Sequence, residues 1–282
     1  MKKAQTILLL LFVPILTHAQ NRIYEKDDSI RIERILSETN CKEYTDNGER
    51  ILDIANEFLG EQYIASTLEN GDKEPLYISC TRLDCTTFVE LVLAISIASD
   101  NGQGSFSDVC NNLERIRYRN GKRDGYASRL HYTSWWIDDN IEKGIIEEVN
   151  ILDLSKRTII DLHYMSRNRE KYPMLKEDTH AVSVIEQMEK RYRGVSVSYI
   201  PKDFLDKSQD SLSIKDGDII MLVTTIDGLD ISHMGFAFWE KGKLHLMHAS
   251  SSRMEVIKDD ATLYEYQKKR KSQSGIRVLR LL

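Results

Sequence analysis

The segment from Asp84 to about Ala98 constrains the fold most, because it is apolar around nearly its whole circumference. A helix over these residues would be roughly 22 Å long at about 1.5 Å per residue. It would need neighbouring elements on most sides to cover it. Cys85 stands in the first turn of this helix and not among the leucines that follow. The sequence therefore predicts a buried central helix with a cysteine at its amino end.

The pattern along the chain changes from helical to strand-like. Residues 27–60 show helical apolar spacing, and residues 105–200, which mix helical stretches with aromatic-rich loops, indicate a helical insertion or side lobe. From Ile214, the runs "DGDIIMLVTT", "ISHMGFAFWE" and "KLHLMHASS" are strand-like, with turns at Asp227-Gly228 and Lys241-Gly242, and "GIRVLRLL" closes the chain. This order predicts an α+β fold in which the central helix packs on a small antiparallel sheet.

The amino terminus has the composition of a secretory signal peptide. A basic "KK" precedes the apolar run "ILLLLFVPIL", and the small-residue end "THA" follows it. The run is too short to span a bilayer, and no cysteine follows it closely to carry a lipid. We expect a signal peptide over residues 1–19, cleaved near Ala19-Gln20. Residues 20–282 are then expected to form a single domain, exported to the periplasm without stable membrane insertion.

Composition and motifs exclude several classes of function. Charged residues make up 29% of the chain, its net charge is -5, and the two signs are interspersed, which disfavours nucleic acid as a partner. The sequence lacks His-Glu-x-x-His, a phosphate-binding glycine loop and Gly-x-Ser-x-Gly, so we expect neither a metal nor another cofactor. The neighbouring acids Asp138 and Asp139 are a poor glycosidase pair, because adjacent side chains on a helix diverge.

The four cysteines do not indicate a disulfide scaffold. They are few and unevenly spaced, at Cys41, Cys80, Cys85 and Cys110. If Cys85 is a free thiol, at most two of the other three can pair, and the sequence leaves that pairing open. An exported chain would then keep at least two unpaired thiols.

Cys85 is a candidate nucleophile because of its place on the predicted helix. Asp84 can cap the helix, and the unsatisfied N–H groups and positive dipole end behind it favour a thiolate and could receive an oxyanion. The alternative is a small buried residue at a helix start. A thiol that attacks an amide also needs a base, which must be a histidine from elsewhere in the fold.

Strand parity separates the three histidines of the predicted meander. A two-residue turn at Lys241-Gly242 makes Glu240 face Lys243, and continued pairing brings Gly235 opposite His248 and His233 opposite Ser250. One face then carries His233, Gly235, Ala237, Leu246, His248 and Ser250. The other carries Phe236, Phe238, His245 and Met247. We therefore expect His248 to lie diagonal to His233 and to orient its ring, with His245 facing away. The alternative is a pair of surface histidines on an edge hairpin, and a bulge would reverse the parity.

Several motifs taken together carry a family resemblance. "LGEQYIAST", "LDCTTFVE", "DGDII", "SHMGFAF" and "HASS" resemble the NlpC-type papain-fold cysteine peptidases of cell-wall metabolism. "DCTTFVE", "DGYASRLHY", "WIDDN", "YIPK" and "HASS" resemble more narrowly their N-acetylmuramoyl-L-alanine amidase-like branch, typical of Bacteroidetes. The resemblance runs from about Phe58 to Ser251. Leu83 departs from it, since many members have tyrosine there, whereas Tyr63 matches the upstream tyrosine and is a candidate to bind or orient the substrate carbonyl.

The resemblance implies a papain-like fold and a triad of Cys85, His233 and His248. It implies an amidase that cleaves the bond between N-acetylmuramic acid, or its anhydro form, and L-alanine in peptidoglycan fragments. We separately expect a monomer. Two alternatives stay open, an endopeptidase that cuts within the stem peptide with the same triad and a wall-binding protein without turnover. The sequence does not decide between fragments and intact wall as substrate.

The aromatic-rich part of the predicted insertion offers a candidate substrate surface. Arg129, His131 and Tyr132 supply hydrogen-bond donors beside the flat apolar faces of Trp135 and Trp136, a combination suited to a sugar or a lactyl-peptide junction. The alternative is that the adjacent tryptophans anchor the lobe to its core.

Overall fold

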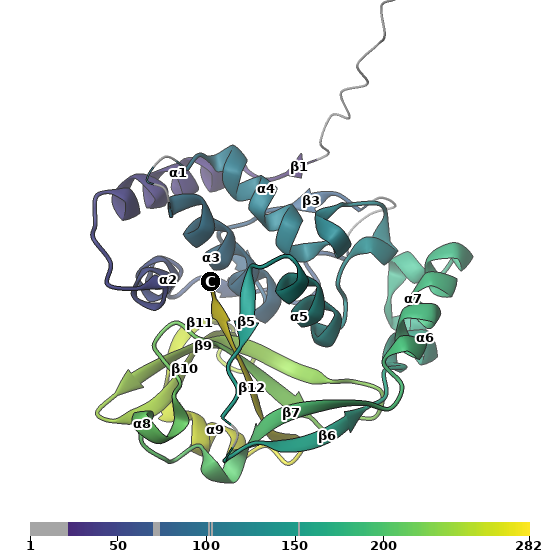
Figure 1. Ribbon diagram of the computed structural model, residues 1–282. Coiled ribbons are helices and arrows are strands. Elements are labelled where there is room, and N and C mark those ends of the chain that lie inside the picture. Colours follow the sequence, from purple (N-terminus) through teal and green to yellow (C-terminus); the bar gives the residue numbers. More distant parts are fainter. Residues whose placement is uncertain (1–21, 70–73, 101, 103, 152) are drawn as a thin grey trace, which may run out of the picture.

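The computed structural model describes residues 22–282 except 70–73, 101, 103 and 152 (Figure 1). The predicted signal peptide lies outside the described residues. The helices are α1 (Lys26–Asn40), α2 (Asn47–Asn56), α3 (Cys85–Ser99), α4 (Phe106–Arg117), α5 (Thr133–Glu142), α6 (Tyr164–Arg167), α7 (Thr179–Arg191), α8 (Gln209–Leu212) and α9 (Leu263–Lys268). Within this part of the chain, no helix has both the length and the apolar character needed to cross a membrane.

The strands form one large sheet and one small one. They are β1 (Arg22–Ile23), β2 (Gln62–Tyr63), β3 (Leu76–Tyr77), β4 (Arg82–Leu83), β5 (Ile146–Glu148), β6 (Lys156–Ile160), β7 (Val195–Pro201), β8 (Ile219–Thr224), β9 (Ile231–Glu240), β10 (Lys243–Ser250), β11 (Glu255–Thr262) and β12 (Gln273–Leu281). The large sheet has ten strands. Nine of them follow the order β4-β2-β11-β10-β9-β8-β12-β7-β6, and the tenth, β5, pairs with β12. β1 and β3 make the small sheet.

The central helix is α3, and it is buried as predicted. Its residues from Thr87 to Ser96 are all buried. Phe88 makes edge-on ring contacts with Phe58, at 6.3 Å between centroids, and with Phe236 of β9, at 5.6 Å. The helix packs against α1, α2 and α4 on one side and against β9 and β10 on the other. Because α3 is apolar on nearly all sides, the hydrophobic effect favours neighbouring elements on all of these sides.

The prediction of a small antiparallel sheet is wrong in size. The sheet is mostly antiparallel, but its ten strands include β5, β6 and β7, which come from residues 105–200. That region is therefore not only helix and loop. Its strands were missed because β6 and β7 lie at the outer end of the sheet, where half-exposed residues weaken the alternation of polar and apolar side chains.

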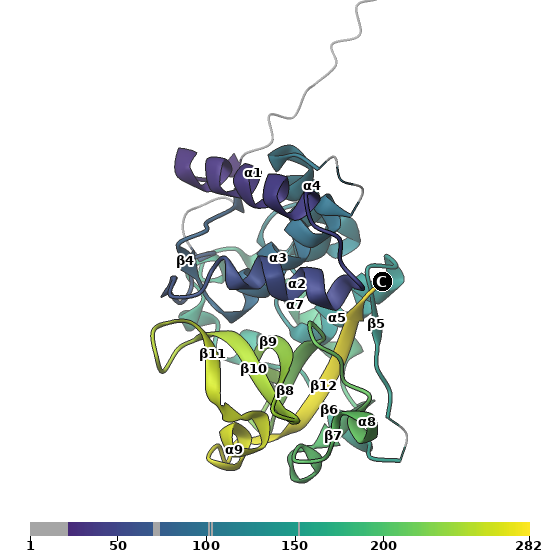
Figure 2. The same ribbon diagram turned by 90° about the vertical axis from the view of Figure 1, so that its left-hand side faces the viewer.

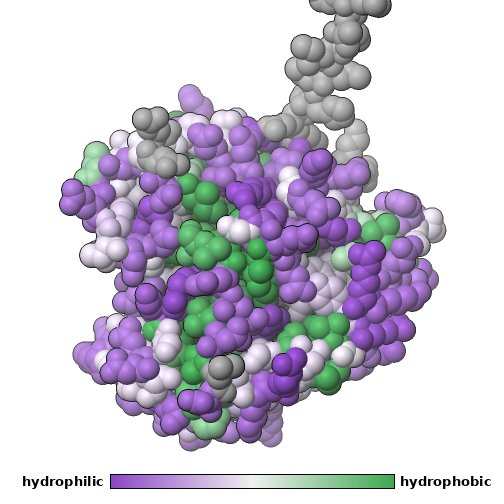
Figure 3. Space-filling view, viewed as in Figure 1, coloured by the Kyte–Doolittle hydropathy of each residue, from purple (hydrophilic) through white to green (hydrophobic). Residues whose placement is uncertain are grey.

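The sheet separates two hydrophobic cores. Phe236 and Met247 face the helical layer, whereas Leu222, Leu246 and Leu263 belong to a second core on the opposite face, under α9. Figure 2 shows α8 and α9 on the side of the sheet away from α1–α4. The surface seen in Figure 3 is mostly hydrophilic, with apolar side chains gathered near its centre.

Candidate functional site

Cys85 is the first residue of α3, and Asp84 caps the helix. The Asp84 carboxylate accepts from the Thr86 N–H at 3.1 Å and the Thr87 N–H at 2.8 Å, and the Thr87 hydroxyl in turn accepts from the Asp84 N–H at 2.8 Å. This reciprocal capping box explains why the helix begins here. The cap leaves the Cys85 N–H unused, and no acceptor for it lies among the described residues. That N–H is the donor this helix end can offer to an oxyanion.

The Cys85 thiol is half-buried and protonated in the resting site. Burial, together with the nearby Asp84 charge, raises the pKa of Cys85 to about 12, although a backbone hydrogen bond from Met234 favours the thiolate. Burial and the Asp84 charge oppose the thiolate that the helix end was expected to favour, so that expectation stays a prediction. Burial raises the pKa of Tyr63 to about 12, and the charges of Cys85 and Asp84 add to this effect. Tyr63 therefore lies near these two residues. The other cysteines are also free thiols.

The hairpin that carries the histidines has the predicted register. Lys241 and Gly242 have φ values of 49° and 72°, as a two-residue type I′ turn requires. The pairing runs from Glu240 opposite Lys243 to Phe236 opposite Met247. His245 stacks on Phe238 at 5.2 Å, on the face that was predicted for it. A Cβ added to Gly235 would come within 2.8 Å of the His248 Cβ, so these two residues share the other face.

The two histidines on that face are in direct contact. His233 Nε2 lies 2.5 Å from His248 Nδ1, and the rings are nearly perpendicular. Burial, with the neighbouring His248 and Arg270 adding to it, lowers the pKa of His233 to about 3. The His233 ring is therefore neutral at ordinary pH.

The ladder of paired residues between β9 and β10 ends before it reaches His233 and His248. The β9–β10 pairing ends at Phe236 and Met247, although β9 continues along β8 to Ile231 and β10 continues along β11 to Ser250. The predicted pairs beyond Phe236 are thus absent from this ladder. The Met234 backbone lies close enough to the Cys85 sulfur to favour its thiolate. The sulfur therefore lies next in space to the residue that follows His233 in the chain.

Three further residues lie near His248, and the sequence did not predict them. The Asp259 Oδ2 lies 3.5 Å from His248 Nε2, the Tyr266 ring stands edge-on to the imidazole at 5.5 Å, and Arg270 lies 3.4 Å above the Tyr266 ring. Asp259 could have been found if β11 had been recognised. His248 of β10 pairs with Ile257 of β11, so Asp259, two positions further along β11, lies diagonal to His248.

The three candidate residues of the aromatic-rich segment are bound within the fold. Arg129 is 6% exposed and pairs with Glu69 at 2.9 Å and Glu74 at 3.1 Å. His131 Nε2 contacts the Tyr126 carbonyl at 2.9 Å, and burial lowers its pKa well below the ordinary value. The Tyr132 hydroxyl is buried, donating to Glu189 and accepting from the Met165 N–H, both at 2.7 Å. A role of these residues in substrate binding stays a prediction.

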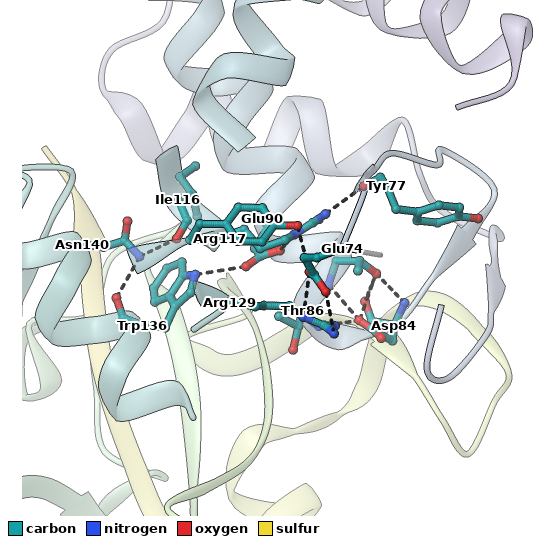
Figure 4. A network of polar contacts seen from close by, with 12 residues as sticks. Glu74, Tyr77, Asp84, Thr86, Glu90, Ile116, Arg117, Arg129, Trp136 and Asn140 are labelled. Atoms are coloured by element: carbon teal, nitrogen blue, oxygen red, sulfur yellow. Dashed lines mark hydrogen bonds and ion pairs between the residues drawn. The ribbon is translucent and has the colours of Figure 1, made fainter. Parts of the chain in front are cut away.

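A buried polar network joins α3 to α4 and α5 (Figure 4). Glu90 of α3 accepts from Arg117 Nε at 2.6 Å and from Trp136 Nε1 at 3.2 Å. Arg117 also donates to the Tyr77 carbonyl at 2.8 Å. Trp136 is 2% exposed, and so anchors α5 to the core, as the alternative interpretation of the tryptophans held. Among the described residues, no cluster of three or more His, Cys, Asp or Glu side chains could hold a metal ion.

Comparison with solved structures identifies the class of fold. An N-acetylmuramoyl-L-alanine amidase from Bacteroides uniformis is 37% identical, with a TM-score of 0.79 over 84% of this chain and 99% of that one. A Bacteroides fragilis protein provisionally described as a xylanase is 44% identical, with a TM-score of 0.76 over 82% of this chain and 100% of that one. The chain therefore has the mixed α+β fold of amidase-like hydrolases.

A family model makes the assignment specific. The model described as AmiA-like, N-acetylmuramoyl-L-alanine amidase-like, matches residues 53–276, and the chain belongs to this family. A Legionella pneumophila protein of the DUF1460 family model shares the fold, with a TM-score of 0.69 and 23% identity over 91% of this chain and 95% of that one. No curated protein matches the sequence.

Proposed function

We propose that the protein is a cysteine amidase that hydrolyses the amide bond between N-acetylmuramic acid, or its anhydro form, and L-alanine in peptidoglycan fragments. The observation that carries this proposal is the contact of 2.5 Å between His233 of β9 and His248 of β10. The next residue of β9, Met234, has a backbone group that favours the Cys85 thiolate. A thiol with a coupled base is the minimum needed for acyl transfer. Membership of the amidase-like family supplies the substrate class.

The resting protonation states favour a concerted first step. The thiol of Cys85 and the imidazole of His233 are both neutral, because burial raises the pKa of one and lowers that of the other. As sulfur attacks the carbonyl carbon, His233 takes the thiol proton and the Cys85 N–H receives the developing oxyanion. His233 then gives the proton to the leaving L-alanine nitrogen as the C–N bond breaks. Water hydrolyses the thioester and frees the lactyl carboxylate and the thiol.

The stem-peptide endopeptidase is the second candidate, because it would use the same three side chains. A wall-binding protein without turnover is the weaker alternative, since binding alone gives no reason for a histidine pair in direct contact on the strands beside a half-buried cysteine. Export to the periplasm is also part of the proposal. It is supported by the order of basic, apolar and small residues before Gln20.

Digestion of defined muropeptides tests the proposed function. The mature chain is incubated with a disaccharide-tetrapeptide, and the products are weighed by mass spectrometry. We expect an intact tetrapeptide that begins with L-alanine, together with a peptide-free sugar. Cys85→Ser should abolish turnover, whereas Cys41→Ser, which alters an exposed thiol, should not. Shortened peptides still joined to the sugar would instead identify an endopeptidase, and full activity of Cys85→Ser would reject the mechanism.

A further inference from the structure

The environment of His248 is asymmetric. The side chain is fully buried, and its Nδ1 contacts His233 Nε2 at 2.5 Å. Its Nε2 has no hydrogen-bond partner within normal geometry among the described residues. The Asp259 Oδ2 faces it at 3.5 Å, slightly longer than a normal hydrogen bond. A buried ring nitrogen with a single polar neighbour depends on that neighbour for its protonation state.

The contact between the two rings couples their tautomers. A neutral imidazole carries one N–H, so one ring must donate and the other must accept at the short contact. If His248 carries its proton on Nε2, its Nδ1 accepts from His233 Nε2–H, and His233 Nδ1 is left free as a base. If His248 carries its proton on Nδ1, the direction reverses and His233 Nδ1 holds the proton. Only the first arrangement can take a proton from Cys85.

Asp259 is placed to select the first arrangement. Its carboxylate is held in position because Oδ1 accepts from the Ala261 N–H at 2.9 Å. Burial opposes ionisation of Asp259, but His248, the Ala261 amide and Arg270 together keep its pKa below the ordinary carboxyl value. A carboxylate can only accept, so it favours the tautomer with the proton on Nε2. The side chain is 18% exposed, which leaves it partly screened.

We propose that Asp259 is a positioning residue that holds the proton of His248 on Nε2 and thereby keeps His233 Nδ1 free to act as the base. This inference rests on the proposed function for its consequence in catalysis. Asp259 touches neither substrate nor sulfur and acts only through the two histidines. The distance of 3.5 Å between Asp259 Oδ2 and His248 Nε2 should shorten to a hydrogen bond if His248 becomes charged during turnover, because the attraction between the two groups then strengthens.

Other charged and titratable groups lie around the histidine pair, and their effects must be distinguished. Tyr266 stands against the His248 ring, and Arg270 lies over Tyr266. The positive charge of Arg270 lowers the pKa of His233. The Asp259 carboxylate, 3.5 Å from His248 Nε2, would stabilise a positive charge on the histidine pair. Cys85 is a further titratable group on this side, and it lies near Tyr266. Loss of the Asp259 charge should therefore make the pair harder to protonate.

The test replaces Asp259 by Asn and by Leu, with Asp260→Asn as the matched control on an exposed neighbour. Asp259→Leu should lower kcat about 10- to 1000-fold with KM changed less than about twofold, because the base spends most of its time in the wrong tautomer. The kcat of Asp259→Asn should lie between those of the wild type and Asp259→Leu, since an amide can present either an oxygen or an N–H to His248. The acid limb of the kcat/KM profile should move to lower pH in both variants and stay in place in Asp260→Asn.

Nitrogen NMR of the imidazoles gives a readout that does not need turnover. The wild type should show His248 with its proton on Nε2, and Asp259→Leu should show a mixture or the reversed tautomer. An unchanged tautomer, or a kcat equal to that of Asp260→Asn, would overturn the proposal. If Asp259→Leu does not fold, Asp259→Ala, which also removes the acceptor, decides by the same spectra. A wild type that shows the Nε2 tautomer but cleaves no muropeptide would reject the proposed function and leave the assignment of Asp259 standing.

Discussion

Asp84 has two separable effects on the site, because it caps α3 and also carries a charge beside Cys85. Its carboxylate accepts two backbone hydrogen bonds at the helix start. Asp84→Ala removes the cap, which typically costs about 1 kcal/mol in the free energy of unfolding. For a domain of this size, that corresponds to roughly 2–4 °C in Tm. Asp84→Asn keeps a side-chain cap of equal rank and should lose only about 0.5 kcal/mol of helix-dipole interaction.

Both substitutions remove the negative charge that contributes to the raised pKa of Cys85. A nearby anion disfavours the thiolate, so its removal should lower the pKa of Cys85 in both variants. The assay is the rate of iodoacetamide alkylation against pH, in a Cys41→Ser background that removes the exposed thiol. We expect the alkylation midpoint to move to lower pH in both variants, with Tm reduced mainly in Asp84→Ala. An unchanged or higher midpoint in Asp84→Asn would refute this account of the Cys85 environment.

Three other perturbations have expected outcomes. Glu90→Gln should cost about 3–5 kcal/mol of unfolding free energy in urea, because Arg117 keeps a buried charge without its partner. Gly235→Ala should displace His248 and reduce kcat with little change in KM, since the added Cβ would lie 2.8 Å from the His248 Cβ. The pKa of His233 is lowered to about 3, so protonation favours the unfolded chain below about pH 6.5. The free energy of unfolding should therefore fall as the pH is lowered from about 6.5 to 3. His233→Gln should make this pH dependence weaker, and an equal pH dependence in the variant would contradict the lowered pKa of His233.

The parts of the fold that were predictable have a strong local signal. α3 was recognisable because it is apolar on all sides and follows a capping aspartate, and both features act within a few residues. The β9–β10 hairpin was recognisable because Lys241-Gly242 fixes a two-residue turn, and the turn fixes which side chains share a face. The separation of His245 from His248 followed from that parity.

The remaining features depend on interactions that are distant in sequence. β11 reads as a charged segment, "EVIKDDAT", and becomes a strand only because β10 pairs with it, so Asp259 could not be placed near His248. The protonation state of Cys85 depends on burial by elements far along the chain, which local helix chemistry does not contain. The sheet was underestimated for the same reason, because β6 and β7 are stabilised by pairing and not by their own pattern.

In the proposed mechanism, Cys85 forms a thioester with the lactyl carbonyl of the muramic acid. The most direct measurement is the intact mass of the protein after a rapid acid quench during turnover of a defined muropeptide, with the adduct located by peptide mapping. The account predicts an adduct on Cys85 with the mass of the sugar and its lactyl group alone. An adduct on Cys85 that also contains stem-peptide residues would contradict the amidase assignment, and turnover by Cys85→Ala would contradict the nucleophile itself.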